Sequence, residues 1–194
     1  MDLIAGLGNP GAEYTDTRHN FGFKVIDLLS NTLGVRLTGR RFHSRNIITK
    51  FYGEDIILLC PKTFMNMSGK SIKACSDFYN IQTDKILIIH DDLDLPAGKV
   101  KVTRQGGAGG HKGVQSIIDY LGNHFFPRVR IGIGRPRQNE IIEDYVLSAP
   151  YDYENDIMEK AIKMSVEACL KFVSEGVDST MNTINNRNEF NGVT

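Results

Sequence analysis

Polar side chains suited to acid–base chemistry follow apolar runs at two points of the chain. His19 lies after the run 3–5, and Asp91 comes just after the run 85–89. Imidazole has an unperturbed pKa of about 6.5, so it can take a proton from water near neutral pH. A carboxylate beside the ring fixes its tautomer and stabilises the imidazolium that forms. We therefore predict that His19 is a general base and that Asp91 holds it.

Two asparagines follow apolar runs of the same kind. Asn9 comes after 3–5, and Asn66 comes after 55–60. A neutral amide both donates and accepts hydrogen bonds, so it can hold a carbonyl oxygen, orient a water or stabilise an oxyanion. Asn9 also precedes Pro10, and asparagine favours turns, so a purely structural role for this residue stays open.

Two other chemistries fit parts of the sequence less well. Gly6, Gly8 and Gly11 match the letters of the dinucleotide fingerprint, but that motif needs a helix that begins at the glycines. Here the helical apolar period starts only near Phe21. The carboxylates within 90–94 suggest a magnesium site, but adjacent residues of an extended strand point to opposite faces. We expect no metal and no cofactor.

The elements that must position these residues alternate between strands and helices. Continuous apolar runs predict buried strands at 3–5, 55–60 and 85–90, and 46–52 pairs with the second of these in a hairpin around 53–54. A hairpin excludes an all-parallel sheet. We predict an α/β fold, a single globular domain with a twisted mixed β-sheet flanked by helices on both faces.

The same strands predict where a site would lie. Ligand sites of open α/β sheets lie beyond the carboxyl ends of the strands, so neighbouring parallel strands would bring the polar motifs together. Amphipathic patterns predict helices at 20–33, 68–79, 114–121 and 153–174, with a last one at 179–186. We assign residues 1–187 to one domain and expect a loose tail over 188–194.

Composition excludes several classes of protein. The 194 residues are 41% apolar and 24% charged, as in ordinary soluble domains. No apolar run approaches the ~20 residues of a membrane span. The N-terminus lacks the pattern of a signal peptide. The three cysteines have no metal or disulfide spacing. We expect a cytoplasmic monomer without membrane contact.

The net charge is zero, but the charges are segregated along the chain. The segment 98–138 carries eight basic residues against one acid, whereas 139–156 carries six acids and no Lys or Arg. A basic region can bind phosphates locally even when an acidic region offsets it. A mixed solvated surface is the alternative, and the segregation favours a polyanionic partner.

Five short motifs stand in one order along the chain. They occupy 6–11, 17–20, 63–66, 90–96 and 109–111. In this order they resemble the motifs of bacterial peptidyl-tRNA hydrolase, and the resemblance covers about 1–187. It implies a metal-independent esterase that frees tRNA from peptidyl-tRNA, with the tRNA acceptor end as its partner.

The resemblance also implies roles for residues. His19 and Asp91 match the catalytic pair of the family, and Asn9 and Asn66 match asparagines that bind the peptide and the tRNA 3′ end. We therefore assign a catalytic role to Asn9 as well. His111 matches the family, whereas the family usually has Asn in place of Lys112.

The resulting predictions divide the remaining residues into two groups. We predict that one group binds substrate: Tyr14, Phe64, Met65, Asn66, His111 and Lys112. We predict that the other holds tRNA phosphates: Lys101, Arg104, Arg128 and Arg130. Stacking is one use for Tyr14 and Phe64, and core packing is the other. Two further classes stay open, a nucleotide-binding oxidoreductase and an RNA-binding module without catalysis.

Overall fold

The computed structural model describes residues 1–137 and 140–190, which form a six-stranded sheet covered by helices. The strand order is β2-β3-β1-β4-β6-β5. The strands are β1 (Asp2–Gly6), β2 (Ser44–Phe51), β3 (Glu54–Pro61), β4 (Ile86–Asp92), β5 (Val100–Thr103) and β6 (Arg128–Gly132). The four inner strands are parallel, and β2 and β5 pair antiparallel at the edges. The predicted mixed sheet is confirmed.

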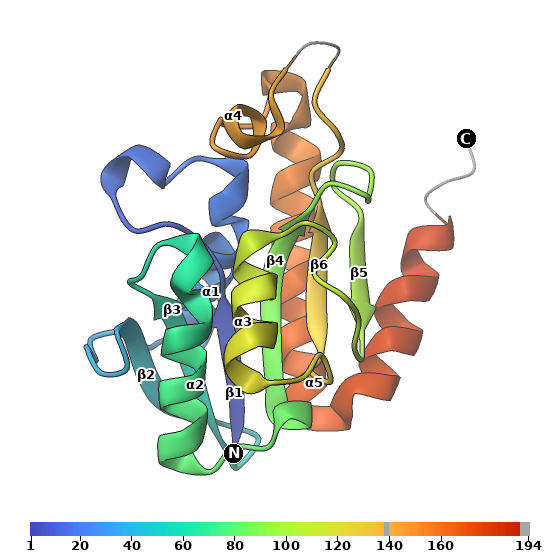
Figure 1. Ribbon diagram of the computed structural model, residues 1–194. Coiled ribbons are helices and arrows are strands. Elements are labelled where there is room, and N and C mark those ends of the chain that lie inside the picture. Colours follow the sequence, from blue (N-terminus) through green and yellow to red (C-terminus); the bar gives the residue numbers. More distant parts are fainter. Residues whose placement is uncertain (138–139, 191–194) are drawn as a thin grey trace.

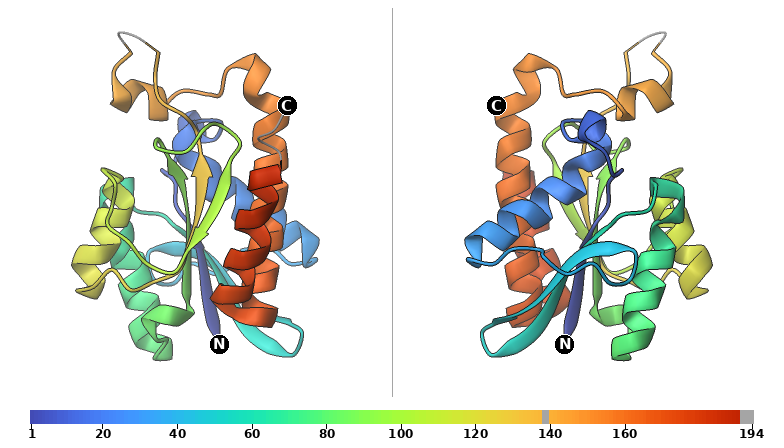
Figure 2. Two further views of the ribbon diagram at one scale, coloured as in Figure 1. Left: turned by 90° about the vertical axis from the view of Figure 1, so that its right-hand side faces the viewer. Right: turned by 90° about the vertical axis from the view of Figure 1, so that its left-hand side faces the viewer.

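Helices cover both faces of the sheet, as predicted. Figures 1 and 2 show α2 (Ser68–Tyr79) and α3 (Lys112–Leu121) on one face, and α1 (Phe21–Thr32) and α5 (Asn155–Phe190) on the other. The short helix α4 (Ile142–Val146) lies beyond the carboxyl ends of the strands (Figure 1). Short 3₁₀ turns occupy Ala12–Tyr14, Arg18–Asn20, Met65–Met67, Thr83–Lys85 and Asp152–Glu154. Among the described helices, none combines the length and apolarity needed to cross a membrane.

Strand β4 separates two hydrophobic cores. Leu87 and Ile89 pack into the core beneath α1 and α5, whereas Ile86 and Ile88 pack into the core beneath α2 and α3. Successive side chains of a strand point to opposite faces, so a strand covered on both sides must be apolar throughout. This is why the run 85–89 shows no alternation.

The hairpin turn between β2 and β3 follows from its two central residues. Tyr52 and Gly53 both have positive φ angles, 49° and 83°. Two-residue turns of this kind match the right-handed twist of the paired strands. The turn sets the register in which Phe51 lies opposite Glu54.

The glycines of the first motif bring α1 close to β1. A Cβ atom on Gly6 would lie 2.1 Å from the carbonyl oxygen of Gly22, and one on Gly22 would lie 2.3 Å from the nitrogen of Leu7. Helix α1 begins only at Phe21, so no helix starts at the glycines. The motif therefore serves helix–strand packing, and the structure does not favour the dinucleotide-binding interpretation.

The C-terminal segment is helical on both sides of Gly176, in agreement with the two helices predicted at 153–174 and 179–186. Helix α5 runs from Asn155 to Phe190 and bends at Gly176, whose φ of 81° and ψ of 175° are not helical. Glycine adopts this conformation without steric cost, so the chain can change direction between the two helical halves of α5. Of the predicted tail 188–194, the last four residues lie outside the described part of the chain.

The second half of α5 covers the free edge of β5. The side-chain amide of Asn185 donates to the carbonyl oxygen of Val102 at 3.0 Å and accepts from its N–H at 2.8 Å. An uncovered edge strand exposes unpaired backbone groups to other chains. Asn185 takes the place that a further strand would occupy.

We expect Asn185→Ala to lower the free energy of unfolding by about 1–3 kcal/mol, because it leaves two backbone groups without partners. Urea denaturation measures this loss. Asn186→Ala, which alters the exposed neighbouring residue, is the matched control and should leave stability within about 0.5 kcal/mol of wild type. Equal stability of the two variants would contradict the role given to Asn185.

Candidate active site

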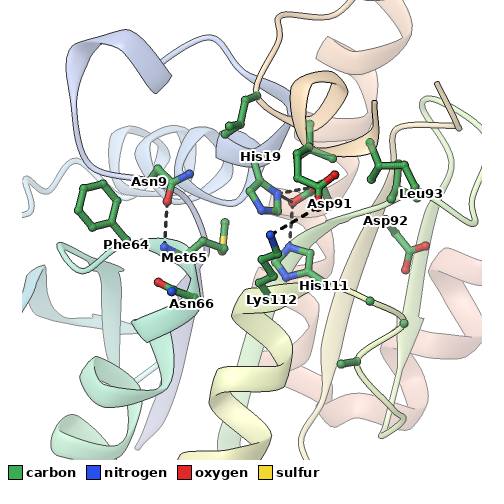
Figure 3. Close-up of a pocket in the computed structure, with 17 residues that line it drawn as sticks. Asn9, His19, Phe64, Met65, Asn66, Asp91, Asp92, Leu93, His111 and Lys112 are labelled. Carbon is green, nitrogen blue, oxygen red and sulfur yellow. Dashed lines mark hydrogen bonds and ion pairs between the residues drawn. The ribbon is translucent and has the colours of Figure 1, made fainter. Parts of the chain in front are cut away.

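The carboxyl ends of β3, β1 and β4 meet at one edge of the sheet and open into a cleft of about 230 Å³ (Figure 3). It is lined by Asn9, His19, Phe64, Met65, Asn66, Asp91, Asp92, Leu93, Ala108, Gly109, Gly110, His111, Lys112, Ile142, Glu143, Val146 and Leu147. The expected convergence of the polar motifs therefore takes place, and α4 adds an apolar wall that the sequence did not suggest.

The pair at the centre of the cleft is His19 and Asp91. His19 lies on the 3₁₀ turn after β1, and Asp91 lies near the end of β4. Nδ1 of His19 is 2.9 Å from each carboxylate oxygen of Asp91. Because an ionised carboxylate only accepts, Nδ1 carries the proton, and the lone pair of His19 is on Nε2.

A second imidazole binds the same carboxylate. His111 precedes α3, and its Nδ1 accepts from the backbone N–H groups of Gly113 and Val114 at 3.1 and 3.2 Å. Its proton must therefore be on Nε2, which donates to Asp91 at 3.0 Å. His111 is thus a helix cap and a hydrogen-bond donor at once, and it ties α3 to the His19–Asp91 pair.

These contacts shift the pKa values of both partners. Burial alone would lower the pKa of His19, but the charge and hydrogen bonds of Asp91 outweigh it and raise the pKa above 6.5. Burial alone would raise the pKa of Asp91, but the two imidazoles hold it well below its usual range. Asp91 therefore remains a carboxylate, and its charge favours the imidazolium form of His19.

His90, next to Asp91 in β4, packs against His111 and is buried beside the His19–Asp91 pair. Its ring lies edge-on to that of His111 at 4.9 Å, and its Nδ1–H donates to the carbonyl oxygen of Asp91 at 2.6 Å. Full burial, followed by the nearby His111, lowers the pKa of His90 far below its usual value. His90 is therefore a neutral packing residue.

The amide of Asn9 has a fixed orientation. Its Oδ1 accepts from the backbone N–H of Met65 at 2.8 Å. Its backbone is held by Asn20, whose amide accepts from the N–H and donates to the carbonyl oxygen of Asn9. The Nδ2 hydrogens of Asn9 are therefore left for a ligand. Asn20 was not among the predicted site residues, although it belongs to the motif 17–20.

The other predicted substrate residues divide by position. Phe64 is 62% exposed on one wall, Asn66 is exposed beside it, and Met65 is buried beneath them. His111 and Lys112 line the opposite side. Tyr14 is not among the lining residues, so the structure does not bring it to the cleft.

The four predicted phosphate-binding residues also differ in position. Lys101 and Arg130 lie directly opposite each other on β5 and β6, and Arg104 is exposed and paired with Asp178. Arg128 is only 3% exposed and donates to the carbonyl oxygens of Gly106 and Gly107. Burial, then Arg130, lowers the pKa of Arg128 to about 10. Its position suits anchoring the glycine loop and does not favour phosphate binding.

Arg18, the residue before His19, was not among the predicted site residues, although it belongs to the motif 17–20. It is buried, and its guanidinium lies 4.0 Å from the ring centre of Tyr145 and 4.7 Å from that of Tyr151. It also forms an ion pair with the buried Glu154 at 2.8 Å. Nothing in the local sequence distinguishes this arginine from an exposed one.

The contacts of Arg18 fasten the segment that contains α4. Its backbone N–H donates to the carbonyl oxygen of Ser148, and its guanidinium donates to the hydroxyl of the same residue. The element that carries His19 and the apolar wall of the cleft are therefore held together. Removing one partner of such a buried ion pair destabilises a protein by about 3–5 kcal/mol.

His19, Asp91 and His111 also form the one group of potential metal ligands in the described part of the chain. Their ligand atoms lie within 4.8 Å of one another. The Nδ1 of His19 and the Nε2 of His111 are already donors to Asp91, so a metal would have to displace both protons. The donor set fits a mutual hydrogen-bond network better than a metal site.

Fold and cleft together define an α/β enzyme whose site lies at the carboxyl edge of its sheet. A family model described as peptidyl-tRNA hydrolase matches residues 3–191, and the chain belongs to this family. Two relatives named peptidyl-tRNA hydrolase align over 95% of this chain and 100% of their own length. The protein from Caldanaerobacter subterraneus subsp. tengcongensis is 42% identical, and that from Geobacillus thermodenitrificans is 44% identical.

Solved structures agree with this assignment. A crystal structure of peptidyl-tRNA hydrolase from Acinetobacter baumannii superposes with a TM-score of 0.90 and 39% identity, over 95% of this chain and 94% of that one. A complex of peptidyl-tRNA hydrolase with N-propanol matches equally well, with a TM-score of 0.90 and 39% identity.

We expect Asp91→Asn to lower the pKa of His19, because the neutral amide no longer stabilises the imidazolium. NMR titration of the imidazole Cε1–H signal measures this shift. Asp92→Asn removes a neighbouring charge that pairs with Arg130, so it is the matched control and should leave the His19 titration unchanged. A His19 pKa that does not move in Asp91→Asn would contradict the pairing.

Proposed function

We propose that this chain hydrolyses the ester bond between peptide and tRNA in peptidyl-tRNA, with His19 as the general base. The single observation that carries the proposal is the bond from Nδ1 of His19 to the buried Asp91, which leaves Nε2 as a proton acceptor in the cleft. We further propose that the protein acts as a monomer in the cytoplasm, where its three free, buried cysteines stay reduced.

The proposed reaction needs one proton carrier. Nε2 of His19 takes a proton from water as the water oxygen attacks the ester carbonyl carbon. Asp91 stabilises the imidazolium without becoming protonated. Collapse of the tetrahedral intermediate breaks the bond to the terminal ribose oxygen, which receives the proton from His19. The free tRNA and the peptide acid then leave the cleft.

Asn9 is suited to stabilise the oxyanion of this intermediate. Since Met65 fixes the carbonyl end of its amide, the Nδ2 hydrogens are pre-oriented and need no rearrangement during the reaction. Loss of one such donor typically costs about 10²–10³-fold in kcat. Asn66 and Phe64, exposed on the same wall, are placed to contact the peptide.

We assign the binding of the tRNA part of the substrate to Lys101 and Arg130, on the two strands at one edge of the sheet. Lys101 and Arg130 face each other in register across β5 and β6, and like charges in this position repel. Asp92 balances Arg130 at 2.6 Å, whereas Lys101 is exposed. An RNA phosphate at this place would relieve the repulsion, which supports a phosphate role for these two residues.

We expect His19→Ala to lower kcat by at least about 10²-fold, the usual scale for loss of a general base. Release of the N-acetyl amino acid from N-acetyl-aminoacyl-tRNA measures the rate, and circular dichroism checks the fold. His124→Ala, an exposed histidine outside the cleft, is the control and should keep full activity. Near-normal turnover by folded His19→Ala would refute the mechanism. If the wild-type protein binds RNA but does not cleave the ester, a non-catalytic RNA-binding module would be favoured instead.

We expect KM to rise with salt concentration, because bound phosphates release counterions. Lys101→Ala should flatten the slope of log KM against log salt by roughly one unit. Lys160→Ala removes an exposed lysine from α5, on the other face of the sheet, and should leave the slope as in wild type. Equal slopes for all three proteins would contradict a phosphate role for Lys101.

A further inference from the structure

Two opposite charges face each other across the mouth of the cleft. Lys112 is the first residue of α3, and Glu143 lies in α4 on the opposite wall. Nζ of Lys112 is 3.6 Å from Oε1 of Glu143, and both residues line the cleft (Figure 3). The contact therefore links α3 and α4 across the cleft.

The ion pair is exposed and easily opened. The side chain of Lys112 is 65% exposed and that of Glu143 is 63% exposed. Water and salt screen such pairs, so their net contribution is small and another anion can replace the carboxylate. A lysine ammonium binds phosphate as a point charge and places few geometric demands on the exchange.

The wall that carries Glu143 is itself fixed. The hydroxyl of Tyr145 donates to the carbonyl oxygen of Ile133 at 2.6 Å, and Ser148 is bonded to the buried Arg18. These contacts hold α4 near its C-terminal end. Exchange at Lys112 is therefore a change of side-chain partner, and it does not require α4 to move.

We propose that Glu143 is an intramolecular competitor that occupies Lys112 until a phosphate of the substrate displaces it. The proposal rests on the proposed function, because it takes the substrate to be a polyanion whose reactive ester lies at His19. Glu143 then weakens the binding of every RNA that reaches the cleft, and only an RNA held elsewhere as well displaces it efficiently. The pair thereby discriminates against short or nonspecific anions.

Removing the competitor should tighten binding. We expect Glu143→Gln to lower KM for N-acetyl-aminoacyl-tRNA by about two- to fivefold at low salt, the scale of an exposed ion pair, with kcat unchanged. The difference from wild type should vanish at high salt. Asp144→Asn removes the same charge from the neighbouring, exposed position of α4, and it is the matched control for a general charge effect.

A double variant separates competition from simple repulsion of RNA. In a Lys112→Asn background, Glu143→Gln should no longer lower KM, because the residue for which Glu143 competes is absent. Lys112→Asn alone should move the acidic limb of the pH–rate profile to higher pH. The Asp91 carboxylate and the neutral His111 still face His19, whereas the Lys112 charge that lowers the His19 pKa is gone.

Two results would overturn the proposal. One is an equal effect of Glu143→Gln and Asp144→Asn, and the other is an undiminished effect of Glu143→Gln in the Lys112→Asn background. Measuring Kd for deacylated tRNA in parallel tests Glu143 without any cleavage, and we expect the same order of variants. Binding in this order without ester cleavage by wild type would reject the proposed function and leave the competition supported.

Discussion

The structure depends on one buried carboxylate. Asp91 is 2% exposed, and a charge taken out of water is tolerated only when hydrogen bonds and opposite charge compensate it. It therefore accepts from Nδ1 of His19 and from Nε2 of His111. This requirement links the turn after β1, the end of β4 and the start of α3. The tautomers of both imidazoles follow from it, and so does the direction in which His19 presents its lone pair.

The walls of the cleft are held by separate polar networks. Asn20 fixes the backbone of Asn9, whose side chain in turn fixes Met65, so the first and third polar motifs are joined by hydrogen bonds. Arg18 and Glu154 do the same for the segment that carries α4. Both networks begin in the 3₁₀ turn Arg18–Asn20, with His19 between their first members. The base, His19, thus lies between the two residues that hold the walls, Arg18 for the segment with α4 and Asn20 for Asn9.

The separation of basic and acidic segments along the sequence is not preserved as separate basic and acidic patches on the surface. Arg128 and Arg130 are two residues apart on β6, but Arg128 is buried against the carbonyl oxygens of the glycine loop, whereas Arg130 is half-buried beside Asp92. The acidic segment after residue 138 is likewise not a separate patch, because Glu143 faces Lys112 and Glu154 faces Arg18. A net charge of zero is therefore compatible with basic residues on β5 and β6, at one edge of the sheet.

The sequence by itself determined the strands around the cleft, the hairpin and the meeting of His19, Asp91 and Asn9, because apolar periodicity and strand direction act locally and place polar residues at strand ends. It also placed a break between two C-terminal helices, and Gly176, whose backbone is not helical, lies in that break. Only the tertiary structure decided that Arg128 is buried, that Tyr14 stays outside the cleft and that Lys112 meets Glu143. Each of these depends on which side chains of distant segments face one another, and local propensity carries no information about such contacts.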